Sequence, residues 1–273
     1  MGGTLLRLVD QGHDVHIAYQ TSGNIAVYDD EVIRFLDFAT DIEAENHALQ
    51  EQFKKVREFL SQKQPGAVDS PEIQNFKALI RKGEALSACR YCGVPESNAH
   101  FMNLPFYQTG TVKKKPHSEA DVQKTYELLQ ELQPHQIFAA GDLSDPHGTH
   151  RVCLQIIFQA LERLKEERAP WLDDCYIWLY RGAWQEWEIA DMEMAVPIGP
   201  KDLERKRNAI FKHQSQKDSA MFPGHDEREF WQRAEHRNKE TARKYDKLGM
   251  AEYEAIEGFV RYHFTPAPGS GNH

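Results

Sequence analysis

Gln136-Ile-Phe-Ala-Ala140 is followed by Asp145-Pro-His-Gly-Thr-His150 and then by Arg151-Val-Cys-Leu-Gln-Ile-Ile-Phe158. The first stretch predicts a buried strand, and the third has the apolar spacing of a helix. In α/β enzymes, ligands bind where a strand ends and a helix begins. Two imidazoles at that point can bind a metal and polarise a substrate, so His147 and His150 are candidate site residues. The alternative is that both only cap the helix or fill its first turn.

The same alternation of strands and helices extends outward from this stretch. Helices are expected over 2–11, 31–60, 71–92, 118–132 and 151–167, and strands over 15–20, 100–105, 136–140 and 174–180. Beyond Pro200, helical patterns dominate, over 202–214 and 226–248. We therefore predict an α/β domain over 1–199, a helical C-terminal extension over 200–264 and a disordered tail over 265–273.

Composition restricts the classes of function. The chain has 273 residues, a net charge of −9 and 40% hydrophobic residues, which is typical of a globular protein with a large core. An acidic chain is a poor match for a nucleic-acid or membrane surface. No apolar run approaches the roughly 20 residues of a membrane span, and no signal peptide is evident, so we expect a cytoplasmic location.

Two short motifs favour structural roles over chemical ones. The sequence Cys89-x-x-Cys92 could indicate redox or zinc chemistry, but it lies in an expected helix and no second pair follows at ligand spacing. The basic run Lys113-Lys-Lys115 fits a solvated loop better than a phosphate site.

The motifs, taken in order, resemble the LmbE-like (PIG-L) family of zinc-dependent N-acetylglucosamine deacetylases. They are, in order, Gly2-Gly-Thr-Leu5, Gly12-His-Asp-Val15, Thr21-Ser-Gly23, Arg81-Lys-Gly-Glu84, Asp145 to His150 and His213-Gln-Ser-Gln216. The sequence Gln20-Thr-Ser-Gly-Asn-Ile-Ala-Val27 looks most like that of the subgroup in which such a domain follows a glucosamine-6-phosphate deaminase-like domain. The resemblance implies a Rossmann-like three-layer sandwich with a mostly parallel sheet.

One feature that the family places before the Gly-Gly-Thr motif has no counterpart in this sequence. The family opens with a strand and a His-Pro-Asp-Asp loop that supplies two zinc ligands and a general base. The resemblance therefore leaves His150 as one zinc ligand, with His147 and Asp145 as catalytic neighbours, Asp145 or Asp142 orienting an imidazole. We expect this chain to bind zinc weakly and to turn over little. The absent strand also leaves a sheet edge that pairing with a second copy would cover.

The resemblance further assigns substrate contacts. Arg81 would reach the sugar or its phosphate, with Glu84 beside it on the same helix; the alternative is a surface ion pair. Asn24 is a candidate by position alone. His213 would line the cleft, or else lie at a helix end.

The function implied for the complete protein is zinc-dependent removal of an N-acyl group from an N-acetylglucosamine-type amino sugar. Two alternatives remain at this point. The chain could be the C-terminal part of a glucosamine-6-phosphate deaminase-like protein, or it could be a non-catalytic sugar-binding module.

Overall fold

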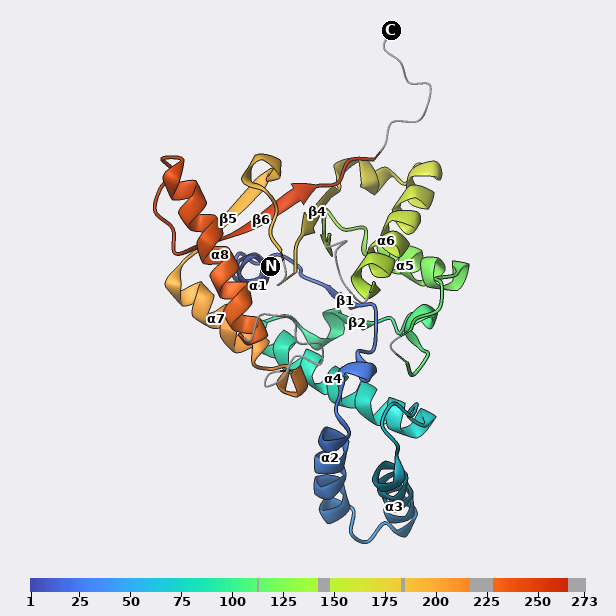
Figure 1. The fold of residues 1–273 in the computed structure, drawn as a ribbon. Coiled ribbons are helices and arrows are strands. Elements are labelled where there is room, and N and C mark those ends of the chain that lie inside the picture. The colour runs from blue at the N-terminus through green and yellow to red at the C-terminus, as the bar shows by residue number, and fades with distance from the viewer. Residues whose placement is uncertain (112, 142–147, 183–184, 217–227, 265–273) are drawn as a thin grey trace. The chain divides into compact units, whose positions relative to one another are not determined.

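The computed structural model describes residues 1–111, 113–141, 148–182, 185–216 and 228–264. Figure 1 labels the helices and strands along the chain. By their contacts the residues form two compact units. Unit 1 contains Met1–Leu8, Pro116–Lys206 and Phe230–His273, and unit 2 contains Val9–Lys115 and Arg207–Glu229. Both units combine helices with parallel strands, so the predicted α/β class is confirmed.

Unit 1 is built on a four-stranded sheet with the strand order β3-β4-β6-β5. β3 (Gln136–Ala140) and β4 (Tyr176–Tyr180) are parallel, as the sequence predicts. β6 (Ala255–Arg261) runs antiparallel to both β4 and β5 (Met194–Ile198). The sheet is therefore parallel on one side and antiparallel on the other.

Helices α5 (Glu119–Leu132) and α6 (Thr149–Glu166) pack together and cover β4. Leu161 and Leu164 of α6 are fully buried in a cluster with Ile177 of β4. A capping box lies at the start of α5, because the Asp121 carboxylate accepts hydrogen bonds from both the backbone N–H and the hydroxyl of Ser118 at 2.8 Å.

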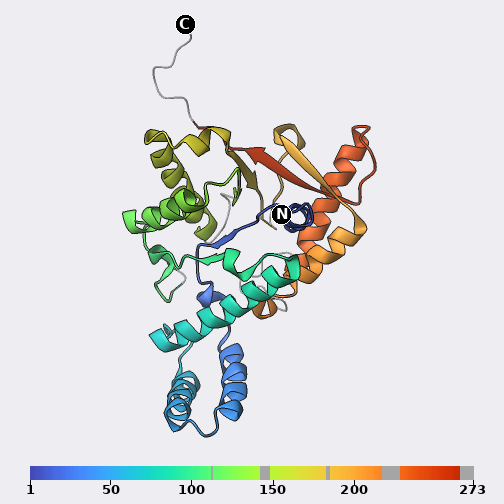
Figure 2. The same cartoon turned by 180° about the vertical axis from the view of Figure 1, so that it is seen from behind.

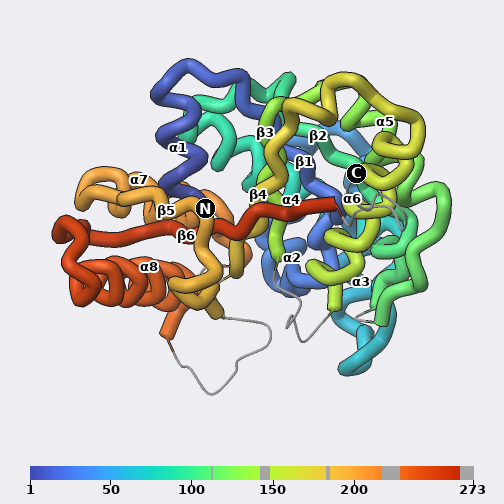
Figure 3. Tube along the Cα trace, turned by 90° about the horizontal axis from the view of Figure 1, so that it is seen from above, coloured from blue at the N-terminus to red at the C-terminus, as the bar shows by residue number. Residues whose placement is uncertain are grey.

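The two antiparallel strands are the main error of the sequence prediction for this unit. We expected a helical extension over 200–264, and that region does contain α7 (Pro200–Ile210) and α8 (Phe230–Lys247). It also contains β6, along which α8 lies (Figure 3). A charged Glu257 and a glycine interrupt the apolar pattern of β6, so local sequence gives a weak strand signal.

Glu257 is nevertheless buried. Its carboxylate caps the N-terminus of the chain's first helix and belongs to a charged hydrogen-bond network. Its carboxylate accepts from the backbone N–H groups of Gly3 (3.1 Å) and Thr4 (2.8 Å), within the first turn of α1 (Gly2–Asp10). Lys206 donates to it at 2.7 Å. An anion at a helix N-terminus satisfies N–H groups that have no partner inside the helix.

Gly3 shows why the Gly-Gly-Thr sequence is needed here. A Cβ atom on Gly3 would lie 2.5 Å from Cδ1 of Ile198 in β5, which is closer than real Cβ contacts allow. The glycine therefore lets the helix approach the sheet closely enough for Glu257 to reach the backbone.

Unit 2 contains two parallel strands, β1 (Ile17–Tyr19) and β2 (Ala99–Phe101). The 22-residue helix α4 (Pro71–Cys92) contacts β2, and the Tyr19 hydroxyl of β1 donates to the Ala85 carbonyl of α4 at 3.4 Å. α4 ends at Gly93, which has a φ of 81°. These elements agree with the sequence prediction.

The predicted helix over 31–60 is in fact a helical hairpin. α2 (Asp29–Ile42) ends before residue 43, and α3 (His47–Gln62) begins after Asn46, whose side chain accepts from the Leu49 N–H at 3.3 Å. Both helices lie together beside α4 (Figure 2). The helical period continues across residues 43–46, so the capping role of Asn46 is the signal that the prediction missed.

Four alternating charges connect this hairpin to α4. Lys63 and Lys77 each contact both Asp29 and Asp69, over N–O distances of 2.5 to 2.8 Å. Burial alone would raise the pKa of Asp29, but hydrogen bonds from the two lysines outweigh it and lower that pKa. The cluster therefore joins the start of α2, the end of α3 and α4 at one point.

Six short 3-10 helices complete the described secondary structure: Asn24–Ala26, Glu96–Asn98, Pro105–Tyr107, Pro170–Asp174, Ile189–Asp191 and Gln214–Gln216. None of the helices in the described ranges has the length and apolar composition of a membrane span. The predicted tail over 265–273 lies outside the described residues.

We expect Glu257→Gln to lower the free energy of unfolding by about 3–5 kcal/mol at pH 7, because it leaves Lys206 buried without its counter-charge. Burial raises the pKa of Glu257, but the charges of Lys206 and the N-terminal amine, with hydrogen bonds from Lys206 and Thr4, together outweigh it and hold that pKa far below the ordinary value. A carboxylate with a lowered pKa stabilises the fold above its unfolded pKa of about 4.3 and loses that effect as the pH falls. Urea unfolding from pH 3 to 7 should therefore show a weaker acid dependence in the variant.

Glu254→Gln is the matched control for this prediction, because Glu254 is partly exposed and pairs with Lys239 at 2.6 Å. Its unfolding curves should follow those of the unsubstituted protein. Equal losses of stability in the two variants would contradict the role given to Glu257.

Candidate functional site

The first part of the candidate site lies at the carboxyl end of β1. The chain leaves β1 after Tyr19 and turns at Gly23, which has a φ of 66°. Asn24 follows and is only 3% exposed. Ligands of open α/β sheets bind at the carboxyl ends of the strands, so this loop is where a substrate contact is expected.

Arg81 and Glu84 lie one turn apart on α4 and form a partly buried ion pair, with Glu84 buried and Arg81 22% exposed. Nη1 of Arg81 is 2.6 Å from Oε2 of Glu84. Ser215 completes the group: its N–H donates to Oε1 of Glu84 at 2.6 Å, and its hydroxyl donates to Oε2 at 2.9 Å. The Glu84 carboxylate is thus saturated by protein donors and fixes the position of Arg81.

Gly23 leaves room for the Arg81 side chain. A Cβ on Gly23 would lie 3.1 Å from Nε of Arg81, and the positive φ of this residue disfavours any other side chain as well. The guanidinium group is therefore placed directly against the loop that follows β1. A planar guanidinium in this position suits paired oxygens of a ligand.

His213 lies near this pair and is kept neutral. Burial, together with the positive charge of Arg81, lowers the pKa of His213 to about 4. Its Nδ1 atom and Oδ1 of Asn24 are buried and have no hydrogen-bond partner among the described residues. Buried polar atoms of native proteins are normally paired, so these two are available to a ligand.

The structure therefore brings Arg81, Glu84 and His213 together in unit 2, next to the Gly23–Asn24 loop. Ser215 was part of the His-x-Ser-Gln sequence but was given no role in the sequence analysis. Gln216 was also missed; its Nε2 donates to the Ala26 carbonyl at 2.5 Å, which holds the 214–216 turn on the loop. The His-x-Ser-Gln spacing was the available signal for both residues.

The predicted zinc ligand His150 belongs to unit 1. His150 is exposed in the first turn of α6. His147, Asp145 and Asp142 lie outside the described residues. Within the described ranges, no group of three His, Cys, Asp or Glu side chains is arranged to hold a metal ion.

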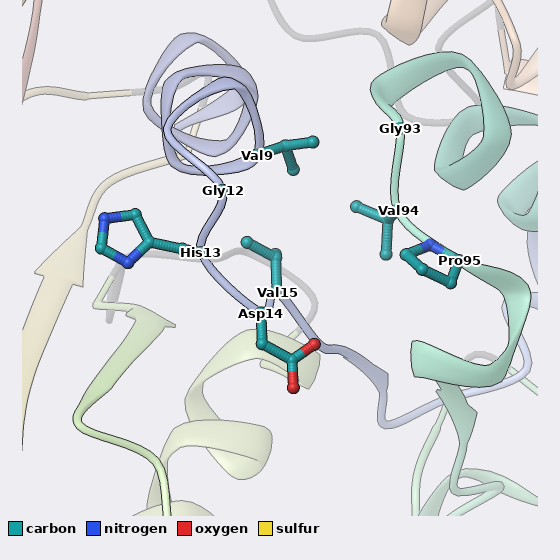
Figure 4. Close-up of a pocket in the computed structure, with 8 residues that line it drawn as sticks. All are labelled: Val9, Gly12, His13, Asp14, Val15, Gly93, Val94 and Pro95. Carbon is teal, nitrogen blue, oxygen red and sulfur yellow. The ribbon is translucent and has the colours of Figure 1, made fainter.

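A separate pocket of unit 2 lies at the opposite, amino-terminal end of β1. It is lined by Val9, Gly12, His13, Asp14, Val15, Gly93, Val94 and Pro95. The valine side chains face the space, whereas the His13 ring points away from it (Figure 4). Asp14 also lines the pocket, but its carboxylate is already hydrogen-bonded to His16 and Asn98, so we assign the pocket no chemistry.

The two motifs interpreted as structural have clear positions. Cys89 and Cys92 are both buried and carry free thiols, and Sγ of Cys89 lies 3.4 Å from the Tyr19 hydroxyl. Lys113 and Lys115 are exposed, as expected of a solvated loop. Lys114 differs: its Nζ lies 4.0 Å from the centre of the Tyr107 ring, and burial lowers its pKa to about 8.

We expect His213 to stay neutral between pH 7 and pH 5, whereas an exposed histidine protonates near pH 6.5. The ring ¹⁵N chemical shifts of His213 over this pH range would measure its protonation, and comparison with His213→Gln would assign its signals. The unfolded chain gains this proton near pH 6.5 and the folded chain only near 4, so His213 lowers stability as the pH falls between these values. Protonation of His213 above pH 6 in the folded protein would contradict its burial beside the positive charge of Arg81.

Comparisons with known proteins give the family. Residues 1–161, more than half of the chain, match the family described as PIG-L, GlcNAc-PI de-N-acetylase. A glucosamine-6-phosphate deaminase-like protein of Bacteroides thetaiotaomicron is 56% identical over 267 residues, which are 96% of this chain. The chain spans only 40% of the length of that relative.

Solved structures support the fold. The N,N'-diacetylchitobiose deacetylase of Pyrococcus horikoshii is 21% identical, with a TM-score of 0.55 over 97% of this chain and 81% of that one. A 4-carboxy-2-hydroxymuconate hydratase of Pseudomonas putida is 12% identical, with a TM-score of 0.58 over 97% and 91%. These similarities confirm the predicted Rossmann-like fold, and the hydratase shows that this fold supports more than one reaction.

The motifs, the α/β fold and the matched residues lead to one conclusion. This chain belongs to the PIG-L (LmbE-like) family of GlcNAc-PI de-N-acetylases.

Proposed function

We propose that this chain takes part in the hydrolysis of the N-acyl group of an N-acetylglucosamine-type amino sugar. The observation that carries the proposal is the Arg81–Glu84–Ser215 group beside the unpaired polar atoms of Asn24 and His213. A sugar presents a dense set of hydroxyl and amide groups, which need both donors and acceptors in a fixed arrangement. The deacetylase family supplies the reaction class.

The residues of unit 2 have distinct roles in this proposal. Arg81 donates to sugar oxygens, and Glu84 and Ser215 keep its guanidinium in position. Asn24 Oδ1 accepts from a hydroxyl or an amide N–H of the substrate. Neutral His213 exchanges a hydrogen bond with the sugar without adding a second positive charge beside Arg81. Glu84 itself acts as a positioning residue, because its two oxygens already accept three hydrogen bonds.

Zinc is the cofactor we propose, with His150 as a ligand, His147 stabilising the oxyanion and Asp145 positioning an imidazole. A zinc ion would polarise the amide carbonyl and lower the pKa of a bound water to roughly 7. A catalytic zinc site needs three protein ligands, and the described residues do not form such a group. We therefore derive no reaction step through the metal from these residues.

A non-catalytic sugar-binding module is the second candidate, and one observation favours it. The residues that we assign to the sugar all lie within unit 2, whereas the described residues hold no group of three metal ligands. The relative described as glucosamine-6-phosphate deaminase-like supports a further alternative, in which this chain is the C-terminal part of such a protein.

We expect the low acetate release of this chain from N-acetylglucosamine, or from a short conjugate of it, to depend on zinc, whose weak binding limits turnover. A chelator should abolish the release and added zinc should restore it, while His150→Gln should lose both zinc affinity and turnover. Acetate release and metal content are the two measurements. Zinc-loaded protein that binds the sugar but releases no acetate would favour the binding module, and undiminished release by His150→Gln would contradict the ligand assignment.

We expect Arg81→Gln to weaken sugar binding by about 10–100-fold, because hydrogen bonds to a charged donor contribute about 1.5–3 kcal/mol. Isothermal titration with N-acetylglucosamine measures this whether or not the chain turns over. Arg90→Gln is the matched control, since Arg90 lies on the same helix and forms an exposed pair with Glu96. Equal affinities for the two variants would remove Arg81 from the sugar site.

A further inference from the structure

One face of α2 exposes three large apolar side chains, and the ring of one of them, Phe35, lies 5.3 Å from the Arg34 guanidinium. Phe35, Phe38 and Ile42 are 44%, 66% and 64% exposed. Their spacings of three and four residues place them on one side of the helix. Tyr28, 42% exposed, continues the same row one heptad before Phe35. We call Tyr28, Phe35, Phe38 and Ile42 the α2 stripe.

The α2 stripe is distinct from the core of the hairpin. Val32 and Leu36 lie on the adjacent face of α2 and are fully buried. They pack in a cluster with Phe53 and Val56 of α3 and Ile73 of α4. Isolated apolar residues on a surface need no explanation, but a contiguous row on one short helix marks an interaction surface.

The surroundings of the α2 stripe are strongly acidic. Residues 28–46 contain seven acidic residues and a single basic one, Arg34. Some of these charges are neutralised within unit 2: Glu31 pairs with Arg34, and Asp37 with Arg57 of α3, both at 2.5 Å. Asp30 and Asp41 are exposed, and the helical period places them on the flank of the stripe that also carries Asp37.

These observations select the kind of partner. A second copy packing α2 against α2 through a two-fold axis would place acidic flanks opposite each other. An anionic membrane surface would be repelled for the same reason. A helix with an apolar row and lysines or arginines beside it would bury the stripe and meet Asp30 and Asp41 with opposite charge.

We propose that the α2 stripe is the docking surface for a basic amphipathic helix of a partner protein. Phe38 and Ile42 are the central anchors, because they are the most exposed members of the stripe. The acidic flank sets the orientation and the rate of association. The surface is independent of the sugar site, because it lies on α2 and involves none of the residues assigned to the sugar.

The probe for this proposal is a synthetic 14-residue helical peptide. It carries leucines at alternating spacings of three and four residues and lysines at the other positions. A second peptide replaces every lysine by glutamate. We expect the lysine peptide to bind the full chain, with an affinity that falls at least tenfold in Phe38→Ser/Ile42→Ser and falls as salt rises from 50 to 300 mM. We expect no binding of the glutamate peptide. Fluorescence anisotropy of labelled peptides measures all of these.

The matched control is Leu248→Ser/Met250→Ser, because these residues are 68% and 55% exposed but belong to unit 1. This control should bind the lysine peptide like the unsubstituted chain, and circular dichroism should show both variants folded. Asp30→Asn/Asp41→Asn should weaken binding and reduce its dependence on salt.

Four results would overturn the proposal. Equal binding of the two peptides, or unchanged binding by Phe38→Ser/Ile42→Ser, would show that the stripe does not recognise a basic helix. Sedimentation showing a dimer of the unsubstituted chain that the same double variant dissociates would identify a second copy as the occupant. Stripe-dependent binding to vesicles of anionic lipid would identify a membrane instead.

Discussion

The buried carboxylate of Glu257 is the interaction on which unit 1 depends. It lies on β6, accepts hydrogen bonds from the first turn of α1 and pairs with Lys206 of α7. Asn238 of α8 also contacts Lys206, at 2.5 Å. One charge therefore joins four elements that are far apart in the sequence. Removing a charge from water is costly, so the arrangement is stable only because every lone pair of the carboxylate finds a donor.

The same principle organises the candidate sugar site in unit 2. Glu84 is not free to contact a ligand, because Arg81 and Ser215 occupy its oxygens. Its effect is to fix the Arg81 guanidinium beside the turn at Gly23. Asn24 and His213 lie next to this fixed pair with polar atoms that the described protein leaves unpaired. A rigid donor beside unpaired acceptors is the arrangement by which proteins select polar ligands.

Local sequence predicted the parallel part of the fold well. β3, α5 with its capping box and α4 with its glycine end carry strong signals, because hydrophobic period and capping chemistry depend only on near neighbours. The break between α2 and α3 and the antiparallel pair β5–β6 were missed. In β6 the acidic Glu257 argues against a buried strand until Lys206 and the start of α1 are placed around it. The motifs likewise named Arg81, Glu84 and His213, but not the role of Ser215.

The sequence by itself determined the family, the α/β class and the residue types of the candidate sugar site, because these depend on ordered motifs and on periodicity. The tertiary structure alone decided which charges are buried and what each of them contacts. It shows Glu84 as a support for Arg81 and Glu257 as the N-terminal anchor of α1. The reason is physical: the free energy of a buried charge depends on donors contributed by distant segments, and sequence order does not record which segments meet.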